Sequence, residues 1–224
     1  PTRVATSAQL DLDISLVIDR SGSMAYASSE VSAYPPNPMH APAGWEFGDP
    51  IPPHARWLDA IAAVQVFISQ LESSPQNEKL SLSVYNHQVS TPQPLTHDYS
   101  LIVSNLTHIS TNFISGGTNI GDGVLEGIGA LGDANRRRPW ATPVIILLTD
   151  GVHNYGTSPK HAANVARDNK VTVFTLTFSD EANQSRMQEV ASISGGKHYH
   201  AVTAAQLQLA FREIAAQLPS LIIR

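Results

Sequence analysis

The feature that most constrains the fold of this chain is a regular alternation between short apolar segments and amphipathic ones. Residues 144–148 are continuously apolar, and 12–18 begin with alternation and end in the apolar run 16–18, as is typical of strands buried on both faces of a parallel sheet. Apolar residues at helical spacing predict helices near 61–71, 99–110, 120–131, 159–169, 183–194 and 207–218. This order favours right-handed βαβ units. We therefore predict an α/β fold, a doubly wound and mostly parallel β-sheet flanked by helices on both faces.

Shorter segments complete the predicted sheet. Residues 80–85 alternate between apolar and polar, and 171–178 and 198–201 are further strand candidates. A hairpin partner is expected from about 88 to 91 and should end at Pro92, because proline lacks the N–H group that a strand ladder uses. With 42% hydrophobic and 15% charged residues and no break in composition, residues 1–224 are predicted to form a single domain.

A long segment, from about 25 to 56, interrupts the alternation where the first helix would be expected. It holds seven of the fifteen prolines, together with Tyr26, Tyr34, Trp45 and Phe47. Loops of this length in compact domains are usually functional or disordered, and the aromatic residues favour order. We interpret the segment as an insertion that either buries its own rings on the surface or takes part in choosing a partner.

Three polar clusters stand where predicted strands end or helices begin. They are Asp19-Arg20-Ser21-Gly22-Ser23, Gly116-Gly117-Thr118-Asn119 and Thr149-Asp150-Gly151. In open parallel sheets, ligands bind beyond the carboxyl ends of the strands, where such loops converge. The sequence therefore predicts one site built from all three clusters.

The chemistry of these clusters points to a hard divalent cation. They supply two carboxylates, Asp19 and Asp150, and three hydroxyls, Ser21, Ser23 and Thr118, without imidazole or thiolate. Oxygen ligands of this kind suit Mg²⁺ first, with Mn²⁺ or Ca²⁺ as alternatives, and are a poor match for Zn²⁺. Two carboxylates only balance a dication, and the neutral hydroxyls add no charge. The bound metal would therefore stay electrophilic, and an open coordination position could take a carboxylate from outside the chain.

These residues carry a resemblance to a known family. Asp19-x-Ser21-x-Ser23, Thr118 after two glycines, and Asp150 in Leu-Thr-Asp-Gly resemble the metal-ion-dependent adhesion site (MIDAS) of von Willebrand factor A domains. The resemblance implies a Rossmann-like fold in which the three hydroxyls coordinate one cation. It implies that Asp19 helps directly or through water, that Asp150 acts through water, and that an Asp or Glu of a protein partner completes the shell. The chain is thus expected to be a divalent-cation-dependent adhesion or protein-interaction module.

A narrower resemblance suggests the setting. The stretches Arg56-Trp57, 74–78, 178–184 and 211–214 resemble the C-terminal A domain of bacterial tight-adherence pilus-associated membrane proteins. That resemblance implies an extracytoplasmic, periplasmic or cell-surface location and an anchor in the full-length protein. The sequence itself contains no stretch of the roughly 20 apolar residues that a membrane-spanning helix needs.

Other function classes are less consistent with the sequence. The net charge of -5 and a single basic run, Arg136-Arg137-Arg138, argue against nucleic-acid binding, and the run is expected to be a solvated loop. A hydrolase could combine Ser21 or Ser23 with His153 and Asp150, but the Gly-x-Ser-x-Gly motif of α/β hydrolases is absent. We therefore expect the chain not to be an enzyme. The remaining alternative is a regulatory or assembly subunit of a larger enzyme or secretion complex that uses the same metal site.

Overall fold

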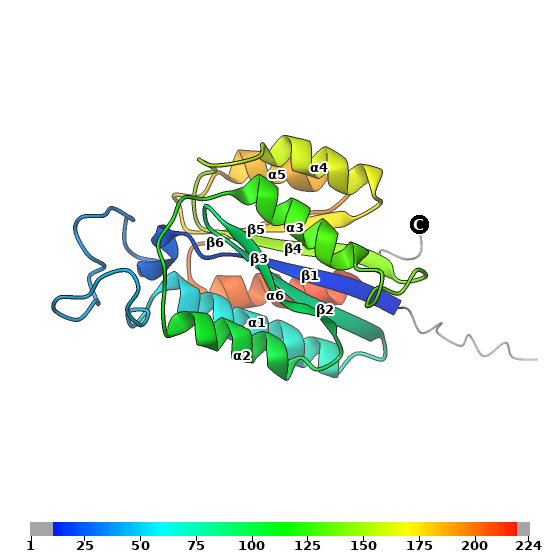
Figure 1. Cartoon of the computed structure of the whole chain (residues 1–224), viewed down its shortest axis with the longest axis horizontal. Coiled ribbons are helices and arrows are strands. Elements are labelled where there is room, and N and C mark those ends of the chain that lie inside the picture. Colours follow the sequence, from blue (N-terminus) through cyan, green and yellow to red (C-terminus); the bar gives the residue numbers. More distant parts are fainter. Residues whose placement is uncertain (1–10, 219–224) are drawn as a thin grey trace, which may run out of the picture.

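A six-stranded sheet lies between two layers of helices in the computed structural model, which describes residues 11–218 (Figure 1). The strands are β1 (Asp11–Asp19), β2 (Asn77–Tyr85), β3 (Val89–Thr96), β4 (Thr142–Thr149), β5 (Thr172–Phe178) and β6 (His198–Ala201). The helices are the 3₁₀ helix η1 (Gly22–Ala25), α1 (Arg56–Glu72), α2 (Ser100–Ser110), α3 (Ile120–Gly132), α4 (Pro159–Asp168), α5 (Gln184–Ile193) and α6 (Ala204–Gln217). The predicted α/β fold with a mostly parallel sheet is confirmed.

The strand order places β1 and β4 at the centre of the sheet. The order is β3-β2-β1-β4-β5-β6, and every neighbouring pair is parallel except the hairpin of β2 and β3. From β1 the chain continues to β2 on one side and only later returns to β4 on the other side. The carboxyl ends of β1 and β4 therefore flank the point where the strand order reverses, which is where open α/β sheets bind ligands.

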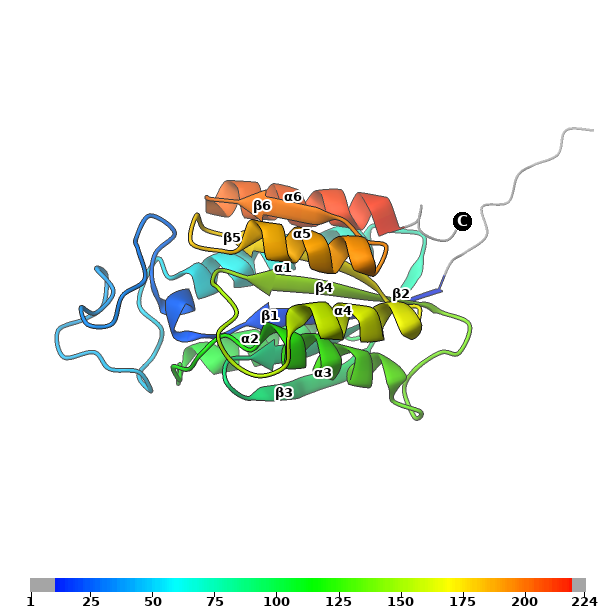
Figure 2. The same ribbon diagram turned by 90° about the horizontal axis from the view of Figure 1, so that it is seen from above.

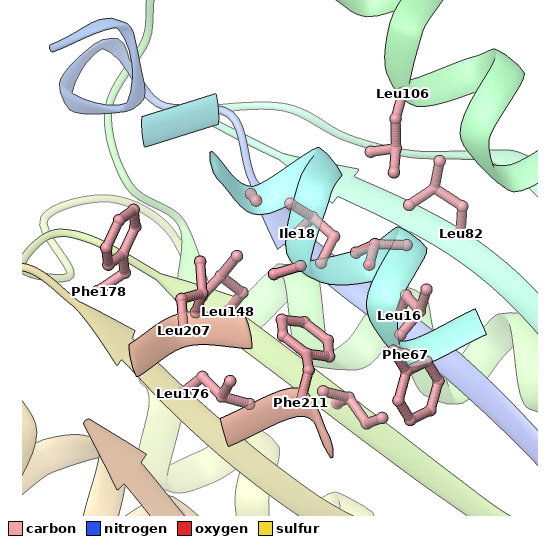
Figure 3. Packing of buried hydrophobic residues seen from close by; sticks show 14 of the residues in the cluster. Leu16, Ile18, Phe67, Leu82, Leu106, Leu148, Leu176, Phe178, Leu207 and Phe211 are labelled. Atoms are coloured by element: carbon pink, nitrogen blue, oxygen red, sulfur yellow. The ribbon is translucent and has the colours of Figure 1, made fainter. Parts of the chain in front are cut away.

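Two apolar cores cover the two faces of the sheet. On one face, alternate residues of β1 such as Leu16 and Ile18 pack against α1, α2 and α6, and Phe67 and Phe211 meet in an edge-on ring contact (Figure 3). On the other face, α3, α4 and α5 pack against residues such as Val17. Figure 2 looks onto the face that α3, α4 and α5 cover. Burial on both faces explains the continuous apolar runs 16–18 and 144–148.

The predicted end of the edge strand β3 was wrong. It was expected to end at Pro92, but it runs through both Pro92 and Pro94 to Thr96. The pairing of β2 with β3 has two register shifts, so the ladder is already irregular at these prolines. On an edge strand, an N–H group that faces away from the neighbouring strand is not needed for the ladder, and proline is tolerated there.

The prediction that the basic run is solvated was wrong for Arg138. The basic run was expected to be solvated, but the Arg138 guanidinium is bound by Asp11, Asp13 and the Leu12 carbonyl at the start of β1. The ion pairs measure 2.7 Å to Asp11 and 2.8 Å to Asp13. This side chain fixes the first residues of the central strand to the loop before β4.

Close packing at the start of α3 leads to a stability prediction. A Cβ on Gly121 would lie 1.8 Å from the backbone carbonyl oxygen of Thr157, so Gly121→Ala must displace that loop. We expect a loss of about 2 kcal/mol in the free energy of unfolding, measured by urea denaturation. Gly129→Ala is the matched control in the same helix, with no atom within 4 Å of its Cβ. It should stabilise the fold by about 0.5–1 kcal/mol, and an equal loss in both variants would contradict the packing argument.

The insertion extends beyond the carboxyl end of β1, away from the start of β1 and the end of α6 (Figures 1 and 2). It comprises residues 26–55, between η1 and α1, close to the predicted 25–56. A bridge between Ala27 and Ala55 closes its base. None of the helices within residues 11–218 is long and apolar enough to cross a membrane.

Candidate metal centre

The structure brings the five predicted site residues together at one end of the sheet. Asp19 ends β1, Ser21 precedes η1, Ser23 lies in η1, Thr118 stands just before α3 and Asp150 follows β4. The Ser21 and Ser23 hydroxyls are 3.0 Å apart, and Ser23 donates a 2.7 Å hydrogen bond to Oδ1 of Asp150. Thr118 lines the same pocket as the two serines.

Thr118 is placed by a reciprocal pair of bonds with the loop after β4. Its N–H donates to Oδ1 of Asn154 at 2.8 Å, and its carbonyl accepts from the Asn154 N–H at 3.1 Å. A Cβ on Gly151 would lie 3.5 Å from Oγ1 of Thr118 and 3.6 Å from Oγ of Ser23. The glycine therefore leaves both hydroxyls facing the same space.

Asp19 is fully buried and its carboxylate is held from both sides. Oδ1 accepts from the Ser21 N–H at 2.8 Å, and Oδ2 accepts from the Thr149 hydroxyl at 2.7 Å. Burial, and then the negative charge of Asp150, raise the pKa of Asp19 from 3.8 to about 7. Two buried carboxylates that repel one another make a place where a cation is favoured.

Arg56 is a site residue that the sequence interpretation did not assign to the site. Its guanidinium is fully buried and donates to Oδ2 of Asp150 at 2.9 Å and to Glu181 at 2.8 Å. It also donates to the Glu30 carbonyl in the insertion. Burial raises the pKa of Asp150, and Arg56 opposes that rise. Arg56 and Glu181 both stood in stretches noted only for their resemblance to pilus-associated domains, and each lies too far from Asp150 in the sequence for spacing to connect them.

A pocket of about 360 Å³ opens above these residues. Its floor holds Ser21, Ser23 and Thr118, and its wall on the insertion side holds Tyr34 and Phe47. A Cβ on Gly22 would lie 3.4 Å from the Phe47 ring, so this ring rests directly on the loop between the two serines. The insertion therefore forms part of the site.

The structure does not bring His153 and the two serines into the arrangement that the hydrolase alternative requires. His153 does not line the pocket that Ser21 and Ser23 line, and its buried Nδ1 has no hydrogen-bond partner among residues 11–218. The serine hydroxyls point instead to each other and to Asp150. Within the described part of the chain, neither serine hydroxyl is hydrogen-bonded to a histidine, which the Ser-His-Asp arrangement requires.

Comparison with known families shows to which family the chain belongs. The family model of the von Willebrand factor type A domain matches residues 52–215. The chain belongs to this family. Its members are metal-dependent protein-interaction modules. The matched part of this A domain begins after β1 and most of the insertion, so Asp19, Ser21 and Ser23 lie outside it.

Solved structures share the fold of this A domain. The PilB minor pilin from Streptococcus sanguinis has a TM-score of 0.70 at 17% identity, covering 96% of this chain and 62% of that chain. Proximal thread matrix protein 1 from the mussel byssus, with a zinc-occupied MIDAS motif, has a TM-score of 0.65 at 18% identity, covering 96% of this chain and 47% of that chain. An aerotolerance-related membrane protein from Bacteroides fragilis, with multiple mutations to serines, has a TM-score of 0.65 at 19% identity, covering 93% and 100%.

The chain spans about half the length of the mussel protein, and no curated protein matches its sequence. At these identities the neighbours establish the fold alone.

The site of the A domain fits a hard cation by the chemistry of its donors. Within residues 11–218 no group of three or more His, Cys, Asp or Glu side chains could hold a metal. Asp19 and Asp150 provide the negative charge, and the hydroxyls of Ser21, Ser23 and Thr118 provide neutral oxygen. This mixture is the ligand type that Mg²⁺, Mn²⁺ and Ca²⁺ prefer.

Proposed function

We propose that this A domain is a divalent-cation-dependent adhesion or protein-interaction module. Asp19, Ser21, Ser23, Thr118 and Asp150 would hold one cation as a complete MIDAS, Mg²⁺ first and Mn²⁺ or Ca²⁺ as alternatives. The bound cation would supply a Lewis acid for an Asp or Glu carboxylate of a protein partner. Three hydroxyls line one open pocket and two buried carboxylates lie beside them, and this arrangement is the observation that carries the proposal.

The residues of the chain have separate parts in this function. Thr149 and the Ser21 N–H hold the Asp19 carboxylate in place, and Arg56 occupies one oxygen of Asp150. The other oxygen of Asp150 accepts a hydrogen bond from the Ser23 hydroxyl. Fixed ligands lose little entropy when they bind a cation, and the open pocket above them gives an external carboxylate access.

The proposed setting is outside the cytoplasm, on an anchored bacterial pilus or surface protein. The resemblance of Arg56-Trp57 and 178–184 to pilus-associated domains supports it. The minor pilin and the byssal thread protein among the neighbours are consistent with it. In this setting the site end of the domain, opposite the start of β1, would face the partner.

Calorimetric titration of the chelator-treated domain tests the proposal. We expect saturable binding of about one Mg²⁺, Mn²⁺ or Ca²⁺ per chain. The affinity of Asp19→Ala should be at least about 100-fold weaker, because the variant lacks one of the two buried carboxylates that balance the charge of the cation. Zn²⁺ is included because the mussel protein's MIDAS holds zinc.

Asp168→Ala removes an exposed carboxylate at the end of α4 and is the matched control, with unchanged affinity. Absence of binding by the folded wild-type domain, or equal binding in Asp19→Ala, would refute a metal site at these residues.

A further inference from the structure

The walls of the pocket carry no positive charge within the described part of the chain. Its lining includes the Glu181 carboxylate and no Lys, Arg or His side chain. Beneath it, Asp19 and Asp150 add two carboxylates, and Arg56, which is fully buried, is already paired with Asp150 and Glu181. Three carboxylates and one guanidinium leave two negative charges, which a single dication would neutralise. The charge is then balanced, so an external carboxylate would be attracted only as a direct ligand of the cation. A second acidic group beside it would meet the Glu181 carboxylate with no further positive charge in the pocket wall.

The insertion side of the pocket is an aromatic wall held in place by hydrogen bonds. The ring centroids of Tyr34 and Phe47 are 5.1 Å apart, and those of Phe47 and Trp45 are 4.9 Å apart. The Tyr26 hydroxyl donates to the Ala33 carbonyl at 2.7 Å, next to Tyr34. Tyr34 is 56% exposed although it lines the pocket. An ordered ring exposed beside a binding site is apolar area that a ligand can cover with little entropic cost.

Exposed apolar side chains are concentrated at this end of the molecule. Among residues 11–218, nine large apolar side chains are exposed. Six of the nine stand on the insertion or on the loops that carry Thr118 and Asp150, namely Val31, Tyr34, Met39, Ile114, Val152 and Tyr155. Clustering of this kind marks a protein-interaction surface.

We propose that the partner of this site is a protein segment with one Asp or Glu next to a single large apolar side chain. The carboxylate binds at the cation and the apolar side chain packs against Tyr34 and Phe47, so the insertion determines specificity. This inference rests on the proposed function, because it requires the cation. It goes further by excluding polyacidic segments and by assigning recognition to residues of the insertion.

Selection from a displayed peptide library tests this inference. The library has three randomised positions on each side of a central Asp or Glu and is selected on the immobilised Mg²⁺-loaded domain. We expect enrichment of Phe, Tyr, Trp or Leu within two positions of the acid, and depletion of further Asp and Glu. A selected peptide should lose about tenfold in affinity when its apolar residue is changed to Ala, measured by fluorescence polarisation. Tyr34→Ala should remove most of that difference.

Leu209→Ala is the matched control, because Leu209 is an exposed apolar residue of α6 that neither lines the pocket nor belongs to the group of six exposed apolar side chains at the site end. It should bind the selected peptides like the wild type. Phe47→Leu, which keeps most of the packed volume, is a second variant and should weaken the apolar preference without unfolding the insertion.

Two failures can be told apart. Peptides selected in Mg²⁺ for their acid but without flanking preference, or with acidic flanks, would overturn the inference and leave the proposed function standing. Calorimetry that finds no cation bound would overturn the proposed function itself. A domain that binds Mg²⁺ and selects no acidic peptide would refute the inference and the adhesive role together.

Discussion

Replacement of Arg56 by methionine is expected to lower the free energy of unfolding by about 3–5 kcal/mol. The guanidinium is fully buried and pairs with Asp150 at 2.9 Å and with Glu181 at 2.8 Å. Without it, Oδ2 of Asp150 is left buried and without the positive charge that compensates it. Removing one partner of a buried ion pair costs more than the pair contributes, because the remaining charge cannot regain water. Urea denaturation in chelator measures the loss.

The same substitution should loosen the insertion. Arg56 donates to the Glu30 carbonyl, and its partner Glu181 accepts from the Ser32 N–H and hydroxyl. One side chain thus connects the metal-site carboxylate to two points of the insertion. We expect faster hydrogen exchange across 27–36 in Arg56→Met, with exchange in β4 and β5 changed much less.

Arg167→Met is the matched control for both measurements. Arg167 also forms a 2.8 Å ion pair, with Asp168, but its side chain is 54% exposed. Exposed pairs contribute little, so this variant should stay within about 0.5 kcal/mol of the wild type. Equal losses in the two variants would contradict the role given to burial.

The central part of the fold and the candidate site follow from local sequence features. Strands buried on both faces favour apolar runs, as in 16–18 and 144–148, although the buried residues Asp13 and Ser15 interrupt the first half of β1. Parallel strands end at the same edge, so polar residues directly after two central strands converge whatever separates them in the sequence. Asp19 and Asp150 could therefore be placed together from the sequence alone.

Other features depend on contacts that sequence spacing does not report. Arg136, Arg137 and Arg138 look alike in sequence, and only the position of Asp11 and Asp13 distinguishes the last of them. Arg56 is separated from Asp150 by 94 residues. A basic residue at the start of an amphipathic helix usually faces solvent, so no local pattern indicates that Arg56 is buried at the site.

The contact between the insertion and the site could not be predicted from the sequence either. Its prolines and aromatic residues indicated an ordered loop, but its contact with the site depends on Phe47 lying against Gly22. That contact follows from the closure of the base at Ala27 and Ala55 and from hydrogen bonds to the chain before α3. Loop paths of this kind are set by the surface that the loop crosses.

Substitution of Asp19 by asparagine is expected to make the domain more stable than the wild type in chelator at pH 8, but not in magnesium. In metal-free protein the pKa of Asp19 is raised from 3.8 to about 7, so the native state keeps a proton that the unfolded chain has lost between these values. The wild type therefore loses stability as pH rises from about 4 to about 7, and stays at the lower level above. The asparagine side chain does not ionise, so at pH 8 in chelator Asp19→Asn should be more stable by about 2–4 kcal/mol. The difference should vanish near pH 4.

Magnesium should remove this advantage. A cation that binds the native wild type at 100 times its dissociation constant adds about 2.7 kcal/mol, whereas the variant lacks one of the two site carboxylates. Urea denaturation of both proteins at pH 4, 6 and 8, with chelator or with Mg²⁺, measures the effect. Subtraction of the variant from the wild type removes the contributions of other titrating groups, and Asp168→Asn controls for loss of an exposed carboxylate. A variant less stable than the wild type in chelator at pH 8 would contradict the cost assigned to burial of the Asp19 charge and to its repulsion by Asp150. Equal stabilisation of both proteins by Mg²⁺ would place the cation away from Asp19.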